Sequence, residues 1–280
     1  MKKFLQFMGV ATIMCFSFFY TEKAVDVVKE YDEVYKKIEE VSEKYKVTPI
    51  DAYIEGNTII PGISGKSVNV DLSYSKMKRY GKYNDSLIVL DDVKPSISIY
   101  DNKDKFIVSG NKKKNYISIL FLIKDIKNLK YILNILDGKN ISADLFLDGN
   151  FIENNMNEFN SIDSKYNIGN LSYNSDYSNS SFPWLDSIIK KKINKNYTFC
   201  YSSNNDTDVA HICSLSNDFT VIPSIVLKSN FISNVKDKIQ NGSIISITVN
   251  DSNKKELPIL INYIISKGYE IKTLNEHLNE

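Results

Sequence analysis

The chain has few side chains that commonly bind a transition metal or transfer protons. It contains two histidines, His211 and His277, and three cysteines. Zinc prefers imidazole, thiolate or carboxylate ligands, and paired histidine ligands usually stand a few residues apart. His211 and His277 lie far apart in the chain, in a predicted helix and in the terminal LNEHL turn. The sequence therefore predicts no catalytic residue and no metal site of the usual kind.

Three other groups of residues resemble chemical sites. Cys200, His211 and Cys213 supply three zinc-type ligands without a fourth, so we favour two buried thiols over a zinc site or a disulfide. Gly65-Lys66-Ser67 ends like a phosphate-binding loop, but Ile60 stands where that loop needs its first glycine. A rebuilt hydrolytic site is the remaining alternative, and its oxygen ligands would be Asp125, Asn170, Ser175 and Asp176.

Composition limits the classes of protein to consider. Of 280 residues, 42% are hydrophobic and 25% are charged, which is typical of a globular protein. The 35 basic and 34 acidic side chains give a formal net charge of +1. A nucleic-acid-binding protein usually carries a basic excess, so we expect no nucleic-acid partner.

The amino terminus has the pattern of a membrane anchor. Lys2 and Lys3 precede the apolar run FLQFMGVATIMCFSFFY over residues 4–20, and no site for signal-peptide cleavage follows it. Positive charge before the run favours a cytoplasmic amino terminus. We therefore expect a single-pass membrane protein whose bulk lies outside the cytoplasm. A cleaved leader, giving a secreted protein, is the alternative.

The remaining sequence suggests three segments. Residues 21–47 carry an apolar residue every three or four positions, which predicts a helical stalk. Residues 48–113 contain short β-like runs such as SVNVDLSY, SLIVL and SISIY between turns, which predict a small β-rich module. Residues 114–280 alternate strand-like and helix-like runs, which predicts an α/β domain, either a barrel or a doubly wound sheet. Strands are expected at residues 116–123, 143–147, 166–169, 197–200, 219–223, 243–249 and 269–273.

Three segments of this last domain resemble the polysaccharide deacetylase (NodB-homology) family. They are ILNILDGKNISADLFLDGNFI, KYNIGNLSYNS and GSIISITVND followed by ISKGYEIKTLNEHL. They occur in the family's order across about residues 114–278. The resemblance implies an irregular (β/α)7 barrel, preceded here by the β-rich module and the N-terminal helix. In that fold, chemistry takes place at the carboxyl ends of the strands.

The resemblance also implies a reaction that this chain lacks the residues to perform. The family removes acetyl groups from sugar polymers with a divalent metal such as zinc, held by one Asp and two His, together with an Asp base and a His acid. The family's two acidic residues fall here at Leu122 and Ile123. Its two histidine ligands fall at Leu171 and Ser175, and its histidine acid falls at Thr248. We therefore expect a degenerate, catalytically silent member without a cofactor.

Polar and aromatic residues near these positions suggest binding instead of catalysis. Tyrosine rings stack on sugars and asparagine pairs with hydroxyl groups, so a glycan-binding rim is expected. Trp184 follows closely in sequence, and we interpret it either as part of this rim or as a core aromatic. The partner would be cell-envelope glycan or an envelope protein, and the alternatives are an active deacetylase with a rebuilt metal site and a structural or assembly protein of the envelope. The expected rim residues are Asn170, Tyr173, Asn174, Tyr177 and Tyr201.

Overall fold

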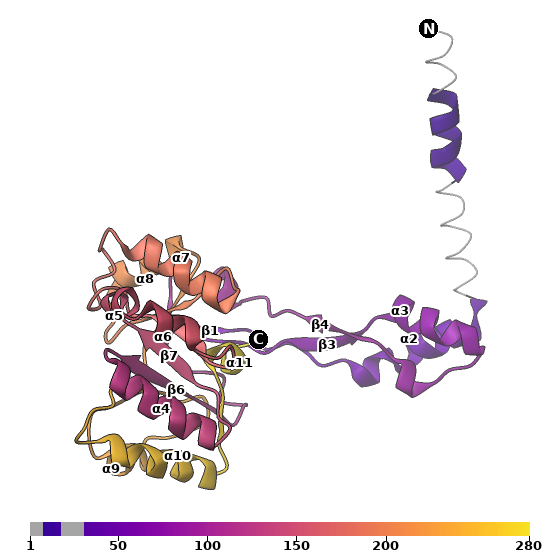
Figure 1. The fold of residues 1–280 in the computed structure, drawn as a ribbon. Helices are drawn as coiled ribbons and strands as arrows, with labels where there is room; N and C mark the ends of the chain where they lie inside the picture. The colour runs from indigo at the N-terminus through magenta and orange to yellow at the C-terminus, as the bar shows by residue number, and fades with distance from the viewer. Residues whose placement is uncertain (1–7, 18–30) are drawn as a thin grey trace. The chain divides into compact units, whose positions relative to one another are not determined.

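The computed structural model describes residues 8–17 and 31–280, which form two compact units (Figure 1). Each unit consists of two stretches of the chain. The first unit contains the described residues up to Pro49 and Ser64–Val93, and the second contains Ile50–Ile63 and Lys94–Glu280. Residues 8–17 are helical, whereas the rest of the predicted anchor at 4–20 lies outside the described residues. Among the helices of the described ranges, none combines the length and the apolar character needed to cross a membrane.

The first unit is built around a helix that the sequence predicted. Asp32 accepts a hydrogen bond from the backbone N–H of Val34 at 2.8 Å and so caps this helix. Its apolar stripe buries Ile38 and Val41, which confirms the described part of the predicted helical segment. The elements of this unit are α2 (Glu33–Tyr45), β3 (Gly65–Val68), α3 (Val70–Met77), η1 (Lys78–Tyr80), η2 (Asp85–Leu87) and β4 (Leu90–Val93), with β3 and β4 paired antiparallel.

A curled sheet of eleven strands forms the centre of the second unit. The hydrogen-bonding order is β1-β2-β5-β10-β9-β8-β7-β6-β12-β11, and β13 pairs with β6. Its pairings are parallel, apart from the antiparallel pair of β1 with β2. The strands are β1 (Tyr53–Glu55), β2 (Thr58–Ile60), β5 (Phe106–Ile107), β6 (Tyr116–Ile123), β7 (Asp144–Leu147), β8 (Asn167–Asn170), β9 (Phe199–Tyr201), β10 (Phe219–Val221), β11 (Ile225–Leu227), β12 (Ile244–Ile247) and β13 (Glu270–Ile271).

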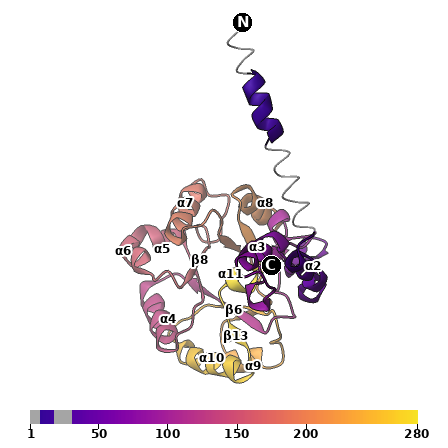
Figure 2. The same ribbon diagram turned by 90° about the vertical axis from the view of Figure 1, so that its right-hand side faces the viewer.

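Helices surround the sheet, as Figure 2 shows in the view along the strands. Proline at the start of α7 and of α10 suits the first turn of a helix, where the missing N–H is not needed. This alternation of strands and covering helices confirms the predicted α/β barrel. The helices are α4 (Ile126–Gly138), α5 (Gly149–Asn154), α6 (Met156–Ser161), α7 (Phe182–Ile193), α8 (Thr207–Leu215), α9 (Phe231–Val235), α10 (Leu257–Ser266) and α11 (Leu274–His277), with short 3-10 turns η3 (Ile99–Asp101) and η4 (Lys254–Glu256).

The structure divides residues 48–113 differently from the predicted β-rich module. Part of this segment belongs to the first unit, while β1, β2 and β5 extend the sheet of the second unit. The run SVNVDLSY was expected to be a strand, yet its second half forms α3 because Asn69 accepts a hydrogen bond from the N–H of Leu72 and starts a helix. The prediction of a strand at SISIY was also wrong, because the 3-10 turn η3 begins within this run.

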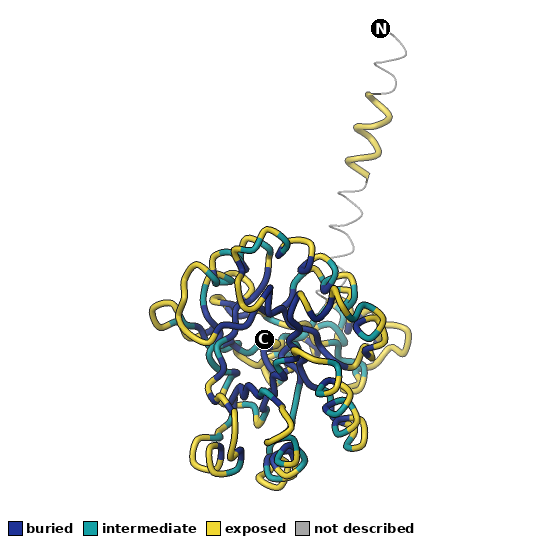
Figure 3. Tube along the Cα trace, turned by 60° about the vertical axis from the view of Figure 1, so that its left-hand side comes forward, coloured by how far each residue is buried: buried dark blue, intermediate teal, exposed yellow. Residues whose placement is uncertain are grey.

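Two hydrophobic cores hold the barrel together. In Figure 3 the buried residues, in dark blue, are concentrated in the middle of the barrel. An outer core lies between the sheet and the helices and takes every second residue of β6, from Ile117 to Ile123. An inner core fills the barrel with the residues that point the other way. Its largest members are Phe146, Phe199, Tyr201 and Phe219, with Leu120, Leu171 and Ile244 beside them.

The C-terminal segment closes the amino end of the barrel, and α11 lies inside the ring of helices in Figure 2. The N–H of Leu274 donates to both carboxylate oxygens of Asp144, at 3.0 and 3.1 Å. His277 is fully buried, with Nδ1 2.8 Å from the hydroxyl oxygen of Ser118. The Glu280 carboxylate accepts a hydrogen bond from the N–H of Gly62 at 2.7 Å. These contacts fasten the C-terminus to three distant parts of the chain.

Candidate functional site

The carboxyl ends of the strands carry several of the positions that the sequence resemblance assigned to the family's metal site. Leu122 and Ile123 are the last two residues of β6. Leu122 is partly buried and packs against the inner core, whereas Ile123 is 1% exposed and belongs to the outer core. Neither side chain carries an atom that can bind a metal or a proton.

Apolar side chains also fill the mouth of the barrel above β8 and β9. Leu171 follows β8 and is 3% exposed within the inner core. The ring of Tyr201 packs edge-on against Phe146 at a centroid distance of 6.0 Å, and its hydroxyl lies 3.5 Å from that of Ser246. This part of the mouth is therefore largely hydrophobic, and the hydroxyls of Tyr201 and Ser246 are among its polar groups.

The other two family positions hold hydroxyl side chains on turns. The N–H of Ser175 donates to the carbonyl of Leu171 at 3.0 Å, so the spacing of the family's two histidine ligands survives as a turn. Ser175 itself is exposed, and its φ of 68° lies in the left-handed region. Thr248 is half-buried after β12, and its carbonyl accepts a hydrogen bond from Asn253 at 2.9 Å. No imidazole stands at either position.

The predicted glycan-binding rim is mostly buried, which corrects the expectation of an open aromatic cleft. The Tyr177 hydroxyl lies 2.9 Å from the carbonyl of Asn170 and accepts a hydrogen bond from the N–H of Tyr201 at 2.9 Å. Burial raises the pKa of the Tyr177 phenol. Its ring packs edge-on against Phe182 rather than facing solvent. Tyr177 therefore links the ends of β8 and β9.

Tyr173 and Asn174 complete this rim and differ in exposure. Tyr173 is 8% exposed, and its hydroxyl donates to the Glu153 carboxylate at 2.6 Å. Burial and that carboxylate raise the Tyr173 pKa to about 12. Asn170 is fully buried, and its Nδ2 has no acceptor among the described residues. Of the five predicted rim residues, Asn174 alone is exposed.

Sequence reasoning missed one acid at the mouth. Asp148 directly follows β7 and is 5% exposed. One of its oxygens accepts from the N–H of Asn150 at 3.0 Å and starts α5, and the other accepts from the N–H of Asn174 at 2.8 Å. The Asp-Gly pair after a buried strand was the available signal. Both carboxylate oxygens are therefore engaged in positioning backbone.

The two acids of the alternative rebuilt site also accept hydrogen bonds from backbone N–H groups close to them in sequence. Asp125 caps α4 through the N–H of Asn128 at 2.8 Å, and Asp176 accepts from the N–H of Ser178 at 3.0 Å. Over residues 8–17 and 31–280, no three His, Cys, Asp or Glu side chains gather as metal ligands would. The two carboxylates of the alternative ligand set, Asp125 and Asp176, thus each accept a hydrogen bond from the backbone of their own turn.

Cys200 and Cys213 form a disulfide, so the expectation of two free thiols was wrong. The bond joins β9 to α8, and both residues are fully buried beside Tyr177 and Phe182. The sequence could not decide between these states because buried thiols and buried disulfides have the same apolar neighbours. Paired sulfurs cannot ligate zinc as thiolates, and His211 is exposed on α8.

Comparisons with known proteins identify the fold. No family model matches the chain. The uncharacterized protein YlxY of Bacillus subtilis (strain 168) is 28% identical over 287 residues, covering 91% of this chain and 86% of YlxY. The structure of BA3943, a CE4 family pseudoenzyme from Bacillus anthracis, has a TM-score of 0.65 at 22% identity, covering 89% of this chain and 96% of that one.

An enzyme of the same fold is similar over a shorter stretch. The Bc1960 peptidoglycan N-acetylglucosamine deacetylase has a TM-score of 0.52 at 20% identity, covering 61% of this chain and 91% of the enzyme. A mutant of BA3943 described as having restored enzymatic activity superimposes as well as the wild type, with a TM-score of 0.65. This chain therefore has the fold of the CE4 polysaccharide deacetylases, as its sequence resemblance predicted, and its structural neighbours include a pseudoenzyme of that family.

Proposed function

We propose that this chain is a catalytically silent deacetylase-fold protein that binds cell-envelope glycan from the outer face of the membrane. One observation supports the proposal that the chain is catalytically silent. Leu122 and Leu171 pack with the inner core at the place where related enzymes need an acidic and an imidazole ligand. Aliphatic groups cannot coordinate a cation, and a charge placed among them is strongly disfavoured unless it is paired.

Acetate release tests the silent state. The purified full-length chain is incubated with acetylated chito-oligosaccharide or peptidoglycan and added zinc or cobalt. We expect no turnover above the protein-free control, while an active family 4 esterase in parallel verifies the assay. Calorimetric titration with zinc should likewise show no tight uptake. Metal-dependent acetate release that disappears in Asp125→Ala or Asp176→Ala would instead support the rebuilt site.

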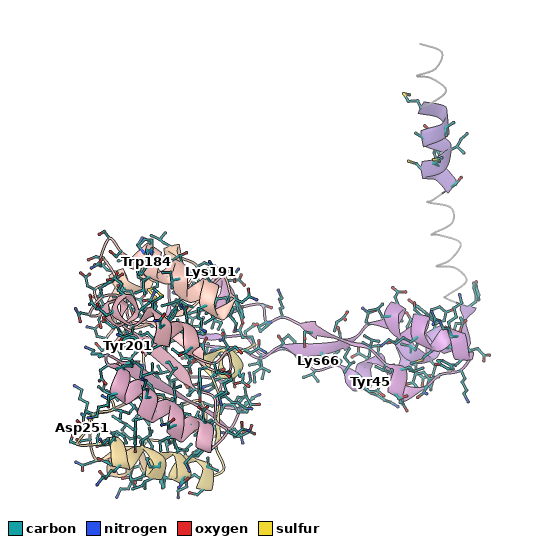
Figure 4. The ribbon with its side chains drawn as sticks, viewed as in Figure 1. Tyr45, Lys66, Trp184, Lys191, Tyr201 and Asp251 are labelled. Atoms are coloured by element: carbon teal, nitrogen blue, oxygen red, sulfur yellow. A yellow bond between two sulfur atoms is a disulfide. The ribbon has the colours of Figure 1, made fainter. Side chains whose placement is uncertain are left out.

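Glycan binding is supported by the neighbours and by an exposed aromatic ring. Bc1960 acts by name on peptidoglycan, a cell-wall glycan. Trp184 is 44% exposed on the first turn of α7, so of its two interpretations the solvent-facing one fits (Figure 4). Asn174 is exposed in the preceding loop. A tryptophan face and an asparagine amide are the groups with which proteins commonly bind sugars.

Trp184 can report on such binding directly, because it is the single tryptophan of the chain. We expect chito-oligosaccharide or peptidoglycan fragments to change its fluorescence. In calorimetry, Trp184→Ala should weaken binding by about tenfold, as loss of one stacking ring implies. Tyr80→Ala, at an exposed tyrosine of the first unit, is the matched control and should bind like wild type. If the Trp184 variant and the wild type bound glycan with equal affinity, the Trp184 ring would not be part of the binding site.

The membrane location rests on sequence and on the disulfide. The apolar run at residues 4–20 follows Lys2 and Lys3, and the Cys200–Cys213 bond suits an oxidising compartment outside the cytoplasm. We expect the full-length chain to stay with membranes after a carbonate wash and to be digested by protease added to intact spheroplasts. Recovery of the chain from the culture medium would favour the cleaved leader instead.

A further inference from the structure

A polar pocket lies at the amino end of the barrel, away from the mouth discussed above. Its volume is about 390 Å³, which is in the range of small-ligand sites. Four segments of the second unit form its walls: Ser142 before β7, the turn before β8 with the start of that strand, the end of α7 with the residues that follow, and the start of α11. The lining mixes polar and apolar groups: most of its residues are lysine, asparagine, serine, threonine or acidic residues, and Tyr166, Ile168 and Ile193 add apolar surface.

Buried hydrogen bonds fix the floor of this pocket. Asn167 is 5% exposed and donates to the Asp144 carboxylate at 2.7 Å. Its amide oxygen accepts from Asn275 at 2.8 Å. Because Asp144 also accepts from the N–H of Leu274, strands β7 and β8 and helix α11 are held in one network. The pocket is therefore preformed rather than a gap between mobile loops.

Two lysines reach this pocket from the end of α7 and differ in their contacts. Lys192 donates to the carbonyl of Asn160 at 2.7 Å. Lys195 lies over the ring of Tyr197 at 5.4 Å, but its ammonium group donates no hydrogen bond to any residue of the described ranges. Burial lowers the Lys195 pKa, and the carboxyl of Asp144 offsets part of that effect. Lys195 thus combines partial desolvation with unused donors.

The nearby acids are already engaged. The Asp163 carboxylate accepts from the N–H of Lys165 at 2.8 Å. Glu276 accepts from the N–H and the hydroxyl of Thr273, at 3.2 and 3.0 Å, and closes the capping box of α11. Neither acid lies within ion-pair distance of Lys195 in the described part of the chain. Asp144 attracts the Lys195 ammonium group without forming an ion pair with it, so an incoming anionic group can still approach this ammonium group directly.

We propose that this pocket binds an anionic oxygen group, a carboxylate or a phosphate, through Lys195 and the polar side chains around it. An ammonium group on a partly desolvated wall forms its strongest hydrogen bonds with ionised oxygens. Ser142, Ser164 and Asn194 add hydroxyl and amide groups suited to a hydroxylated ligand. The group can come from a carboxylated saccharide or from free phosphate, and the experiment separates these sources.

The test uses the full-length chain in detergent micelles and three probes: glucuronate, glucose and inorganic phosphate. We expect calorimetry to detect glucuronate or phosphate but not neutral glucose. A carboxylated saccharide as the source predicts tighter binding of glucuronate than of phosphate, and free phosphate predicts the reverse order. Lys195→Gln should lower the affinity for the detected anion by about tenfold, because one charge-assisted hydrogen bond is lost.

Two further variants keep this test decisive. Lys191→Gln removes an exposed charge from the last turn of α7, four residues before Lys195 and outside the pocket, and should bind like wild type (Figure 4). Lys195→Arg retains the positive charge and should recover most of the affinity. Thermal unfolding of each variant confirms that the fold is intact. Absence of binding by wild type at millimolar probe, or equal binding by Lys195→Gln and Lys191→Gln, overturns the proposal. Glycan binding at Trp184 is unaffected by either result.

Discussion

Among single residues, Asp144 has an unusual position, because its carboxyl group is fully buried inside a barrel whose core is otherwise mainly apolar. Burial raises its pKa to about 7, although hydrogen bonds from Asn167 and from the N–H of Leu274 act in the opposite direction. Glu276 raises the pKa further, and Lys195 lowers it slightly. The folded chain therefore holds a proton that an unfolded chain releases near pH 4.

This proton makes stability depend on pH. Because the folded pKa of Asp144 lies above the ordinary value of 3.8, its favourable contribution is complete below about pH 4 and is lost as pH rises to about 7. The loss approaches about 1.4 kcal/mol per pH unit in between. Asp144→Asn cannot titrate, so the difference in free energy of unfolding between wild type and variant should decrease over this interval. Urea unfolding at several pH values measures it.

A matched variant isolates the effect from the titration of other groups. Asp237→Asn changes an exposed carboxyl group of the same unit and should follow the pH profile of wild type. His277 also titrates differently in the fold, since burial and Lys114 lower its pKa to about 3, but it is present in all three proteins. Parallel profiles for wild type and Asp144→Asn would contradict the assignment.

Residue chemistry also explains why part of the site could be described from the sequence and why the predicted rim could not. That Leu122 and Leu171 offer no ligand atoms follows from their side chains and required no structure. The predicted exposure of Tyr173 and Tyr177 was wrong. From sequence alone a tyrosine can be expected at the surface, but its hydroxyl can equally form a hydrogen bond with a buried partner. The partners found, Glu153 and the backbone of Asn170 and Tyr201, are set by tertiary folding.

Among the elements, β9 and α8 are joined covalently and offer a measurable contribution. The Cys200–Cys213 bond closes a loop with a sequence separation of 13. Loop-closure entropy for that length predicts about 3 kcal/mol of stabilisation. Cys200→Ser combined with Cys213→Ser should lower the free energy of unfolding by this order, as chemical denaturation would show. The same loss should appear on reducing the wild type, and the double variant should not respond to the reductant.

Strand β5 offers a second measurement. The sequence analysis assigned this strand to the β-rich module, whereas in the structure it belongs to the sheet of the barrel. Ile107 is 1% exposed in the inner core, and β5 pairs with both β2 and β10. Ile107→Ala should cost about 2–5 kcal/mol of unfolding free energy. Ile97→Ala, at a position 41% exposed, should cost less than about 0.5 kcal/mol. Similar losses for the two variants would argue that β5 is not part of the barrel core.

The predictability of the elements depended on their length and burial. Strand β6 was predicted at its observed bounds because eight consecutive apolar or small residues, buried on both faces, are typical of a central parallel strand. Strands β1, β2 and β5 have two or three residues each, and β5 pairs with β10, which is far away in sequence. Such short strands carry too little pattern to be assigned to a sheet from sequence alone.

For the whole molecule, the two units predict unfolding in two steps. The first unit buries a small cluster around Ile38, Tyr74 and Met77, while the second holds both large cores. A small core buries less apolar surface and tolerates less denaturant. Trp184 lies in the second unit, so its fluorescence should change at higher urea than the first loss of circular dichroism. Coincident transitions for both signals would show one cooperative unit instead.

The path of the chain through these units has a consequence for proteolysis. The chain passes between them at Pro49–Ile50, at Ile63–Ser64 and again at Val93–Lys94. Each unit is thus assembled from two separate stretches of sequence. One nick within residues 50–63 leaves the contacts of α2 with α3 in place, and because these helices lie on opposite sides of the nick, the fragments stay associated. A protease must sever all three passages before the two units can separate.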